Sequence, residues 1–99
     1  MAKRIEWSDK AIDRLSQAIK YLKLEVSHTA AANFADLIDK RIAFIEKHPI
    51  SGRKVVNRKT IRFILVGKHY RLYYRVHGSV LYITALFDTR QDPSKRPYQ

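Results

Sequence analysis

The last third of the chain restricts its fold more than any other part. Thr60–Val66, His69–Val76 and Ser79–Phe87 are three consecutive runs rich in Ile, Val, Leu, Phe and Tyr, the residue types that are enriched in strands. Gly67-Lys68 and His77-Gly78 separate the runs and fit two-residue hairpin turns of types II′ and I′. The pattern predicts a three-strand antiparallel meander.

Two tight turns also predict which side chains share a face of this sheet, because neighbouring residues of a strand alternate between its faces. Two apolar rows are expected to face the rest of the core: Phe63–Leu72–Ile83 and Ile61–Tyr74–Leu81. The opposite, open face is expected to carry arginines and tyrosines in the rows Arg62–Tyr73–Tyr82 and Ile64–Arg71–Thr84, continued by Arg75 and Asp88.

Ahead of the meander, apolar residues recur at steps of three and four, the period of amphipathic helices. Residues 3–7 alternate like a short strand, and Ser8 then supplies an N-cap hydroxyl. The first helical stripe is Ile12, Leu15, Ile19, Leu22 and Val26, and the second is Ala31, Phe34, Ile38, Arg41 or Ile42, and Ile45. Polar residues 27–29 join the helices and His48-Pro49 ends the second, so an antiparallel helical hairpin is expected.

The remaining segments lack periodicity. Residues 49–59 are rich in turn formers and bases and are expected to be a loop, and residues 88–99 hold two prolines and are expected to be an irregular, mobile tail. A chain of 99 residues has the length of one domain, residues 1–99. The predicted fold class is α+β: an N-terminal strand and an antiparallel two-helix hairpin packed on a twisted antiparallel sheet that ends in the meander.

Positive charge is concentrated in the second half of the chain. Residues 1–52 hold nine basic and seven acidic side chains, whereas residues 53–99 hold eleven basic and two acidic ones. No acidic residue lies between Glu46 and Asp88. This half is expected to attract polyanions, although a solvated basic surface that only aids solubility would have the same composition.

The open face of the meander is the candidate binding site. Arginine binds phosphate through two parallel hydrogen bonds, and tyrosine rings stack on bases. A nucleic-acid cleft would use Arg62, Arg71, Tyr73 and Arg75 on this face, with Arg90, Lys95, Arg96 and Tyr98 beyond it. The alternative is that the arginines solvate the exposed side of the sheet while the tyrosines pack edge-on.

Several function classes find no support in the sequence. The chain has no cysteine and its four histidines lack metal-ligand spacing, so no metal or other cofactor is expected. It has no apolar run of the roughly 18–20 residues that span a bilayer and no hydrophobic signal region, so a cytoplasmic protein without membrane contact is expected. His69 and His77 lie in or beside turns, which favours a structural role over general acid–base catalysis.

Three stretches resemble the RelE/ParE family of toxins of bacterial type II toxin–antitoxin systems. IEWSDKAIDRLSQAIKYL is similar to the family's first strand and helix, EKHPISGR to the exit of its second helix, and HYRLYYRVHGSVLYITALFDTRQDP to its central strands and the arginine after them. The resemblance covers nearly the whole chain. It implies a helical hairpin on a twisted antiparallel sheet, and an antitoxin partner with an acidic or amphipathic segment that wraps the toxin.

The same resemblance implies growth inhibition with one of two targets. RelE-like members cleave mRNA on the ribosome, whereas ParE-like members poison DNA gyrase and have no comparable nuclease site. The chain is therefore an endoribonuclease if it is RelE-like and not an enzyme if it is ParE-like. A non-toxic basic RNA- or DNA-binding module is the alternative that charge and aromatic content alone allow.

The residues of the RelE-like nucleases carry over only in part. Arg71 matches their strand arginine, and Arg90 matches the arginine after the last strand. Arg62 falls where they carry a first lysine, but their second lysine falls on Ile64, which cannot bind phosphate. Tyr98 stands for the late tyrosine, with a different spacing from the arginine. These departures and the long helical hairpin favour the ParE-like interpretation.

Overall fold

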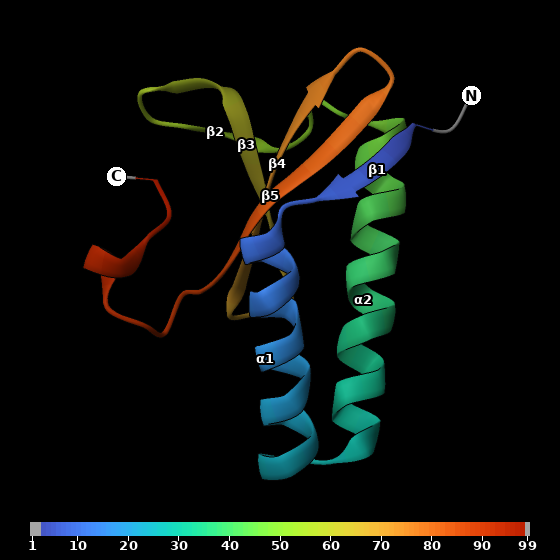
Figure 1. Cartoon of the computed structure of the whole chain (residues 1–99), viewed down its shortest axis with the longest axis vertical. Helices are drawn as coiled ribbons and strands as arrows, with labels where there is room; N and C mark the ends of the chain where they lie inside the picture. Colours follow the sequence, from blue (N-terminus) through green and yellow to red (C-terminus); the bar gives the residue numbers. More distant parts are fainter. Residues whose placement is uncertain (1–2, 99) are drawn as a thin grey trace.

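The computed structural model describes residues 3–98, in which a helical hairpin lies on one face of a five-stranded sheet (Figure 1). Residues 1–2 and 99 lie outside the described part of the chain. The strand order is β1-β5-β4-β3-β2. The elements are β1 (Arg4–Trp7), α1 (Asp9–Glu25), α2 (His28–Lys47), β2 (Arg53–Val55), β3 (Arg58–Val66), β4 (Tyr70–His77), β5 (Val80–Asp88) and the short 3-10 helix η1 (Pro93–Lys95).

The predicted fold class is confirmed, with two additions to the sheet. The sheet is mixed rather than wholly antiparallel, because β1 runs parallel to β5, from Arg4 opposite Val80 to Trp7 opposite Ile83. Strand β2 pairs with β3 in the segment that was predicted to be only a loop. The chain reverses there at Asn57, which has a φ of 65°, a backbone region that asparagine tolerates better than most residues.

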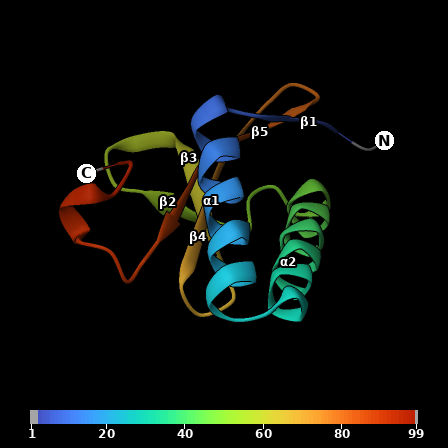
Figure 2. The same ribbon diagram turned by 60° about the horizontal axis from the view of Figure 1, so that its bottom comes forward.

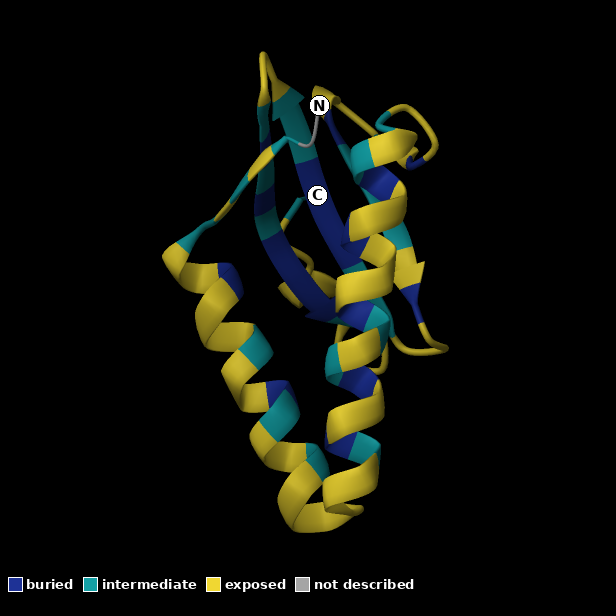
Figure 3. Cartoon of the chain, turned by 90° about the vertical axis from the view of Figure 1, so that its right-hand side faces the viewer, coloured by how far each residue is buried: buried dark blue, intermediate teal, exposed yellow. Residues whose placement is uncertain are grey.

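The helices begin where their caps predict. The side chain of Ser8 accepts a hydrogen bond from the backbone N–H of Ala11, and Ser27 accepts one from Ala30. The buried residues of α2 agree with the predicted stripe, with Ile42 rather than Arg41 facing inward, and they are Ala31, Phe34, Ile38, Ile42 and Ile45. Figure 3 shows exposed residues along the outer faces of both helices and buried residues on the strands behind them.

The stripe predicted for α1 is correct only in its middle. Leu15, Ile19 and Leu22 pack against the core, but Ile12 and Val26 at its two ends are exposed. The fully buried positions of α1 are Ala11 and Ala18, whose small side chains let the helix approach β5 closely. Both helices extend beyond the sheet, and the C-terminal tail lies on the far side of α1 from α2 (Figures 1 and 2).

The turn between β3 and β4 is one residue longer than predicted. Val66 pairs with Tyr70, so the loop is Gly67-Lys68-His69 rather than Gly67-Lys68. The carbonyl of His69 instead accepts hydrogen bonds from the backbone N–H and the hydroxyl of Thr89, which follows β5. This one-residue shift moves every side chain of β3 to the other face of the sheet.

The second hairpin also differs in register, but its faces are mostly as predicted. The turn is Gly78-Ser79, with Gly78 at a φ of 59°, and His77 pairs with Val80. The shift amounts to two residues, which preserves the faces. A bulge then changes the register, because Tyr74 lies opposite Ile83 whereas Tyr73 lies opposite Ala85. Residues of β5 after the bulge therefore exchange faces.

Two apolar clusters result, one on each face of the sheet. The helix-facing cluster contains four residues predicted there, Leu72, Tyr74, Leu81 and Ile83, and also Ile64, Val66 and Leu86. The second cluster, on the opposite face, contains Ile61 and Phe63, which were predicted to face the helices, together with Tyr73, Ala85, Phe87, Val55 and Tyr98. The face away from the helices is thus partly covered by the tail.

Candidate functional site

Aromatic residues surround Arg71 on the face of the sheet away from the helices. Its guanidinium carbon lies 4.4 Å from the centre of the Phe63 ring, within the range of a cation–π contact. One guanidinium nitrogen also lies 3.5 Å from the hydroxyl oxygen of Tyr73. The Nε of Arg71 is buried and has no hydrogen-bond partner within residues 3–98. Arg71 therefore has one buried N–H donor that these residues leave unsatisfied.

The tail is held against this cluster by Tyr98. The Tyr98 hydroxyl donates a hydrogen bond of 2.8 Å to Oγ1 of Thr84, the bulge residue of β5. The centre of the Tyr73 ring lies 5.2 Å from that of Tyr98 and 5.5 Å from that of Phe63. Tyr73 is only 2% exposed, so it cannot stack on a base while the tail is in place. The tail is irregular apart from η1, but this contact anchors its end.

Arg75 and Tyr82 form a second arginine–aromatic pair on the same face. They are cross-strand neighbours, and the guanidinium carbon of Arg75 lies 4.2 Å from the centre of the Tyr82 ring. Both side chains are only partly buried. The open face therefore carries Arg71, Tyr73, Arg75 and Tyr82, as predicted.

Arg62 does not belong to this group, contrary to the prediction. It pairs with Tyr74 on the helix-facing side, because the longer turn has exchanged the faces of β3. Its guanidinium donates to the carbonyls of Ile50 and Gly52, at 3.1 and 2.8 Å. These contacts hold the loop that follows α2. Ile64 was expected beside Arg71 and instead packs in the helix-facing core.

Arg90 lies beside Asp88 and not beside Arg71. Its guanidinium donates from Nε and Nη2 to the two carboxylate oxygens of Asp88, at 3.0 and 2.9 Å. Asp88 lies opposite Tyr70, on the helix-facing side, since the bulge has reversed its predicted face. The charge of Arg90 is thus largely neutralised within the chain.

The ion pair changes the titration of its members. Burial by itself would raise the pKa of Asp88, but the hydrogen bonds and the charge of Arg90 outweigh it, so the pKa lies below its ordinary value of 3.8. The same hydrogen bond raises the pKa of Arg90. Burial, followed by the charge of Asp88, raises the pKa of the neighbouring Tyr70.

We expect the Asp88–Arg90 pair to stabilise the fold at neutral pH and not in acid. Because the pKa of Asp88 is lowered by folding, its contribution is complete above the ordinary carboxyl pKa and is lost as pH falls through the folded value. Asp88→Asn should lower the free energy of unfolding by about 1 kcal/mol at neutral pH, and the difference should disappear as pH falls through the lowered pKa of Asp88. Denaturant titrations at several pH values measure this, with Asp36→Asn on α2 as the control. An Asp88→Asn effect that is independent of pH would contradict the assignment.

The four residues that match the nucleases are therefore only partly brought together. Arg71 and Tyr98 both contact Tyr73, whereas Arg62 and Arg90 lie on the helix-facing side. Of the remaining basic residues predicted to bind nucleic acid, Lys95 and Arg96 are exposed on the tail. The functional roles of all these residues remain predictions.

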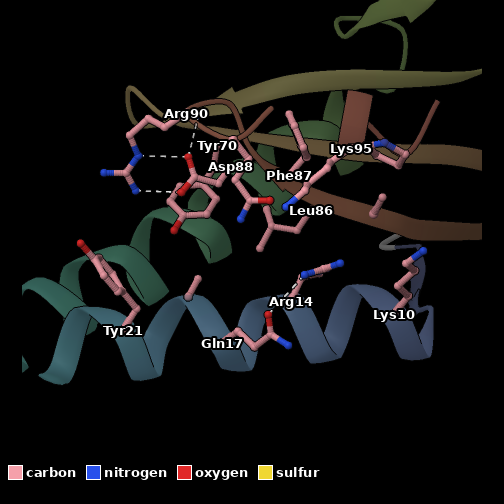
Figure 4. A pocket seen from close by; sticks show the side chains of 14 residues that line it. Lys10, Arg14, Gln17, Tyr21, Tyr70, Leu86, Phe87, Asp88, Arg90 and Lys95 are labelled. Carbon is pink, nitrogen blue, oxygen red and sulfur yellow. Dashed lines mark hydrogen bonds and ion pairs between the residues drawn. The ribbon is translucent and has the colours of Figure 1, made fainter. Parts of the chain in front are cut away.

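A groove along α1 was missed by the sequence analysis. It lies between α1 on one side and the end of β5 with the tail on the other, and has a volume of about 420 Å³ (Figure 4). The residues that α1 contributes recur at helical spacing, and they are Lys10, Arg14, Gln17 and Tyr21, with Ala18 below them. This polar stripe is visible in the sequence, but only the position of the tail turns it into a groove.

Other kinds of site find no support in the described residues. Residues 3–98 contain no group of three or more His, Asp or Glu side chains that could hold a metal ion. None of the helices in this range is long and apolar enough to cross a membrane.

Comparisons with known proteins agree with this architecture. Three solved structures are similar in fold: a chromosomal ParDE toxin–antitoxin system from P. aeruginosa (TM-score 0.73, 14% identity, 88% of this chain and 96% of that chain covered), a YoeB/ParE toxin from Agrobacterium tumefaciens (0.64, 15%, 86% and 96%), and a YoeB dimer from Staphylococcus aureus (0.65, 15%, 86% and 94%). No curated protein sequence matches significantly.

The sequence itself matches a family model. The model describes the ParE toxin of the type II toxin–antitoxin system parDE, and the match extends over residues 5–93, from β1 to η1. It thus includes both helices, the whole sheet and the start of the tail. This chain therefore belongs to the family of ParE toxins of type II toxin–antitoxin systems, which implies an antitoxin partner.

Proposed function

We propose that the chain inhibits growth in the ParE-like way, by binding DNA gyrase in the cytoplasm, and that a cognate antitoxin neutralises it. The observation that carries this proposal is the separation of the basic residues that mRNA cleavage would need. Arg71 lies on the open face, Arg62 holds the loop after α2, and Arg90 is paired with Asp88.

Cleavage of RNA requires several groups to converge on one phosphate. A base must reach the 2′-hydroxyl and cations must meet the charge that develops on the phosphate oxygens. In this chain the second lysine of the nuclease pattern is replaced by Ile64, which lies in the helix-facing core. Arg90 would have to leave the carboxylate of Asp88 to reach a phosphate on the open face.

The open face instead has the composition of a protein-binding surface. Arginine and tyrosine are enriched at the centres of protein interfaces, and here Arg71 and Arg75 each lie against an aromatic ring. Leu65 at the edge of this face is 51% exposed, which adds apolar surface. A target bound through such a surface needs no group that transfers a proton.

Ribosome-dependent mRNA cleavage is the second candidate. It is favoured by the proximity of Arg71 and Tyr98, which both contact Tyr73. The Nε of Arg71 also has no hydrogen-bond partner within residues 3–98. Arg71 and Tyr98 correspond to two residues of the nuclease pattern. If this activity exists, the tail must move to admit RNA, because Tyr98 covers Tyr73.

Induced expression with two parallel readouts tests the proposal. We expect growth arrest accompanied by gyrase-linked DNA breaks, while mRNA on purified ribosomes stays intact in the presence of the purified protein. Co-expression of the protein encoded by the adjacent gene should restore growth. Cleaved mRNA without DNA breaks would establish the second candidate, and the absence of growth arrest would favour a non-toxic nucleic-acid-binding module.

A further inference from the structure

A short basic hairpin projects from the β2 edge of the sheet (Figure 1). It consists of β2 and the start of β3, over residues 53–60, and the chain reverses in it at Val56-Asn57. We call this feature the basic hairpin. None of its eight residues is acidic or aromatic, and four are basic: Arg53, Lys54, Arg58 and Lys59. These four cations are distinct from the residues that the sequence predicted to bind nucleic acid.

The cations of the basic hairpin are exposed and not neutralised within the described chain. All four side chains belong to exposed residues, and no ion pair within residues 3–98 involves any of them. Arg58 donates one long hydrogen bond of 3.4 Å, to the carbonyl of the adjacent Asn57. The nearest acidic residues in the sequence are Glu46 and Asp88, and Asp88 is engaged by Arg90. Four uncompensated charges on eight residues create a positive field that attracts a polyanion.

The cations lie on both faces of the basic hairpin. Residues that pair directly across two strands share a face of the sheet. Arg53 pairs with Phe63 of the open face, whereas Lys54 pairs with Arg62 of the helix-facing side. A flat anionic surface could engage the cations of one face only. A groove with phosphates along both walls can engage the cations of both faces.

The basic hairpin is held in position at its base. Val55 packs in the cluster that contains Ile61 and Tyr98, and the end of the tail lies beside the hairpin in both views (Figures 1 and 2). Packing of this kind reduces the loss of chain entropy on binding, because the hairpin is already ordered. The tip remains free, since Val56 is 76% exposed.

Among nucleic acids, double-stranded DNA fits the basic hairpin best. The major groove of B-form DNA is about 12 Å wide and admits a two-stranded β-ribbon, whereas the major groove of an RNA duplex is too narrow for side chains to read. Single strands are bound largely by stacking on aromatic rings. The basic hairpin has no such ring, and Tyr73 of the open face is covered by the tail. The exposed Val56 can contact thymine methyl groups in the DNA groove.

We propose that the basic hairpin binds double-stranded DNA, with its tip in the major groove and its four cations against the phosphates of both strands. The binding is largely independent of base sequence, because contacts to phosphates carry no sequence information. This inference goes beyond the proposed function, since it requires DNA and not gyrase. A toxin that binds gyrase through the open face would then also contact DNA through the basic hairpin.

A salt titration with purified DNA tests this inference. The full chain is titrated against a short labelled DNA duplex of arbitrary sequence, and the dissociation constant is measured over a range of salt concentrations. We expect a dissociation constant of about 1–100 μM near physiological salt. Arg53→Gln, Lys54→Gln, Arg58→Gln and Lys59→Gln together should weaken binding by about 100-fold at low salt. The slope of log affinity against log salt should become shallower by about 3–4, because four phosphate contacts are lost.

Two control variants separate the basic hairpin from net charge and from misfolding. Lys20→Gln, Lys23→Gln, Lys40→Gln and Arg41→Gln together remove the same charge from exposed positions of the two helices. They should leave affinity within about fivefold of the wild type, because salt screens charges that lie beyond a Debye length. Arg53→Lys combined with Arg58→Lys keeps the charge and should keep the salt slope. Circular dichroism and thermal unfolding establish that each variant is folded.

Three results would overturn the proposal. The first is the absence of DNA binding by the folded wild-type chain, and the second is an equal loss of affinity in the hairpin and helix variants. The third is an affinity for an RNA duplex, or for polyglutamate of the same charge, that equals the affinity for DNA, since another polyanion would then replace DNA. Growth arrest with gyrase-linked DNA breaks is compatible with each of these results, so this inference and the proposed function can fail separately.

Discussion

Gly52→Ala is expected to lower the free energy of unfolding by about 2–4 kcal/mol. A Cβ at this position would lie 2.5 Å from the hydroxyl oxygen of Tyr74 and 3.0 Å from the carbonyl oxygen of Phe63. Tyr74 cannot move aside cheaply, since it is 1% exposed. Its hydroxyl also accepts from the N–H of Gly52 and donates to the carbonyl of Pro49. For a domain of this size the melting temperature should fall by roughly 10–20 °C.

A double variant isolates this contact from a general effect of alanine in the loop. Tyr74→Phe alone should cost about 1–3 kcal/mol, because it removes the hydroxyl and leaves the buried N–H of Gly52 without its partner. Gly52→Ala should lower the free energy of unfolding less in the Tyr74→Phe background than in the wild type. The hydroxyl oxygen, which is the atom nearest to the new Cβ, is absent from that background. Chemical denaturation of the four proteins measures the coupling. Additive losses, or a neutral Gly52→Ala, would contradict the packing described for this loop.

Local sequence signals were enough to predict the helical hairpin. Ser8 caps α1 as predicted, and Ser27, one of the polar residues expected between the helices, caps α2. The stripe of α2 is correct because four bulky residues at helical spacing can only face one core. The stripe of α1 was less well predicted, because the residues that this helix buries most completely are Ala11 and Ala18. Small residues carry little weight in a search for hydrophobic periodicity.

The register of the sheet was harder to predict, since it depends on contacts that are distant in sequence. Gly67-Lys68 fits a two-residue turn, but the third turn residue, His69, is held by Thr89 from beyond β5. The bulge at Thr84 likewise coincides with contacts from Ser8 and Tyr98. Neither bond has a local signature in the chain.

The candidate site was predicted wrongly wherever its residues depended on the register of the sheet. The extra turn residue moved Arg62 and Ile64 across the sheet, and the bulge moved Asp88. Arg71, Tyr73, Arg75 and Tyr82 kept their predicted face because the β4–β5 register changed by two residues, which preserves the alternation. Whether the basic residues of a sheet lie on the same face therefore depends on single-residue differences in turns and bulges. Composition and charge cannot predict these differences.

The tail should matter more for toxicity than the two arginines that match the nucleases. Deletion of residues 91–99 removes Lys95, Arg96 and Tyr98 together, keeps Arg90, and is expected to expose Tyr73, against which Tyr98 packs. If the chain acts by binding its target, loss of the tail should weaken this binding by about 30-fold or more, which is the effect of removing one strong interface contact. Growth arrest at matched expression measures the loss, and Tyr98→Phe, which keeps the ring and loses only the hydrogen bond to Thr84, is the mild control.

Arg71→Ala combined with Arg90→Ala tests whether toxicity needs the two arginines that match the nucleases. If the chain acts by binding, the double variant loses one arginine of the open face, so growth arrest should weaken by about tenfold, less than in the tail deletion, provided that circular dichroism and thermal unfolding show it to be folded. A nuclease would lose about 10²–10³ in rate for each donor to the scissile phosphate. Loss of toxicity in the folded double variant, together with loss of mRNA cleavage on purified ribosomes, would reject gyrase binding in favour of mRNA cleavage. That outcome would also require Arg90 to exchange Asp88 for phosphate, and Asp88→Asn, which weakens the ion pair, should then increase cleavage.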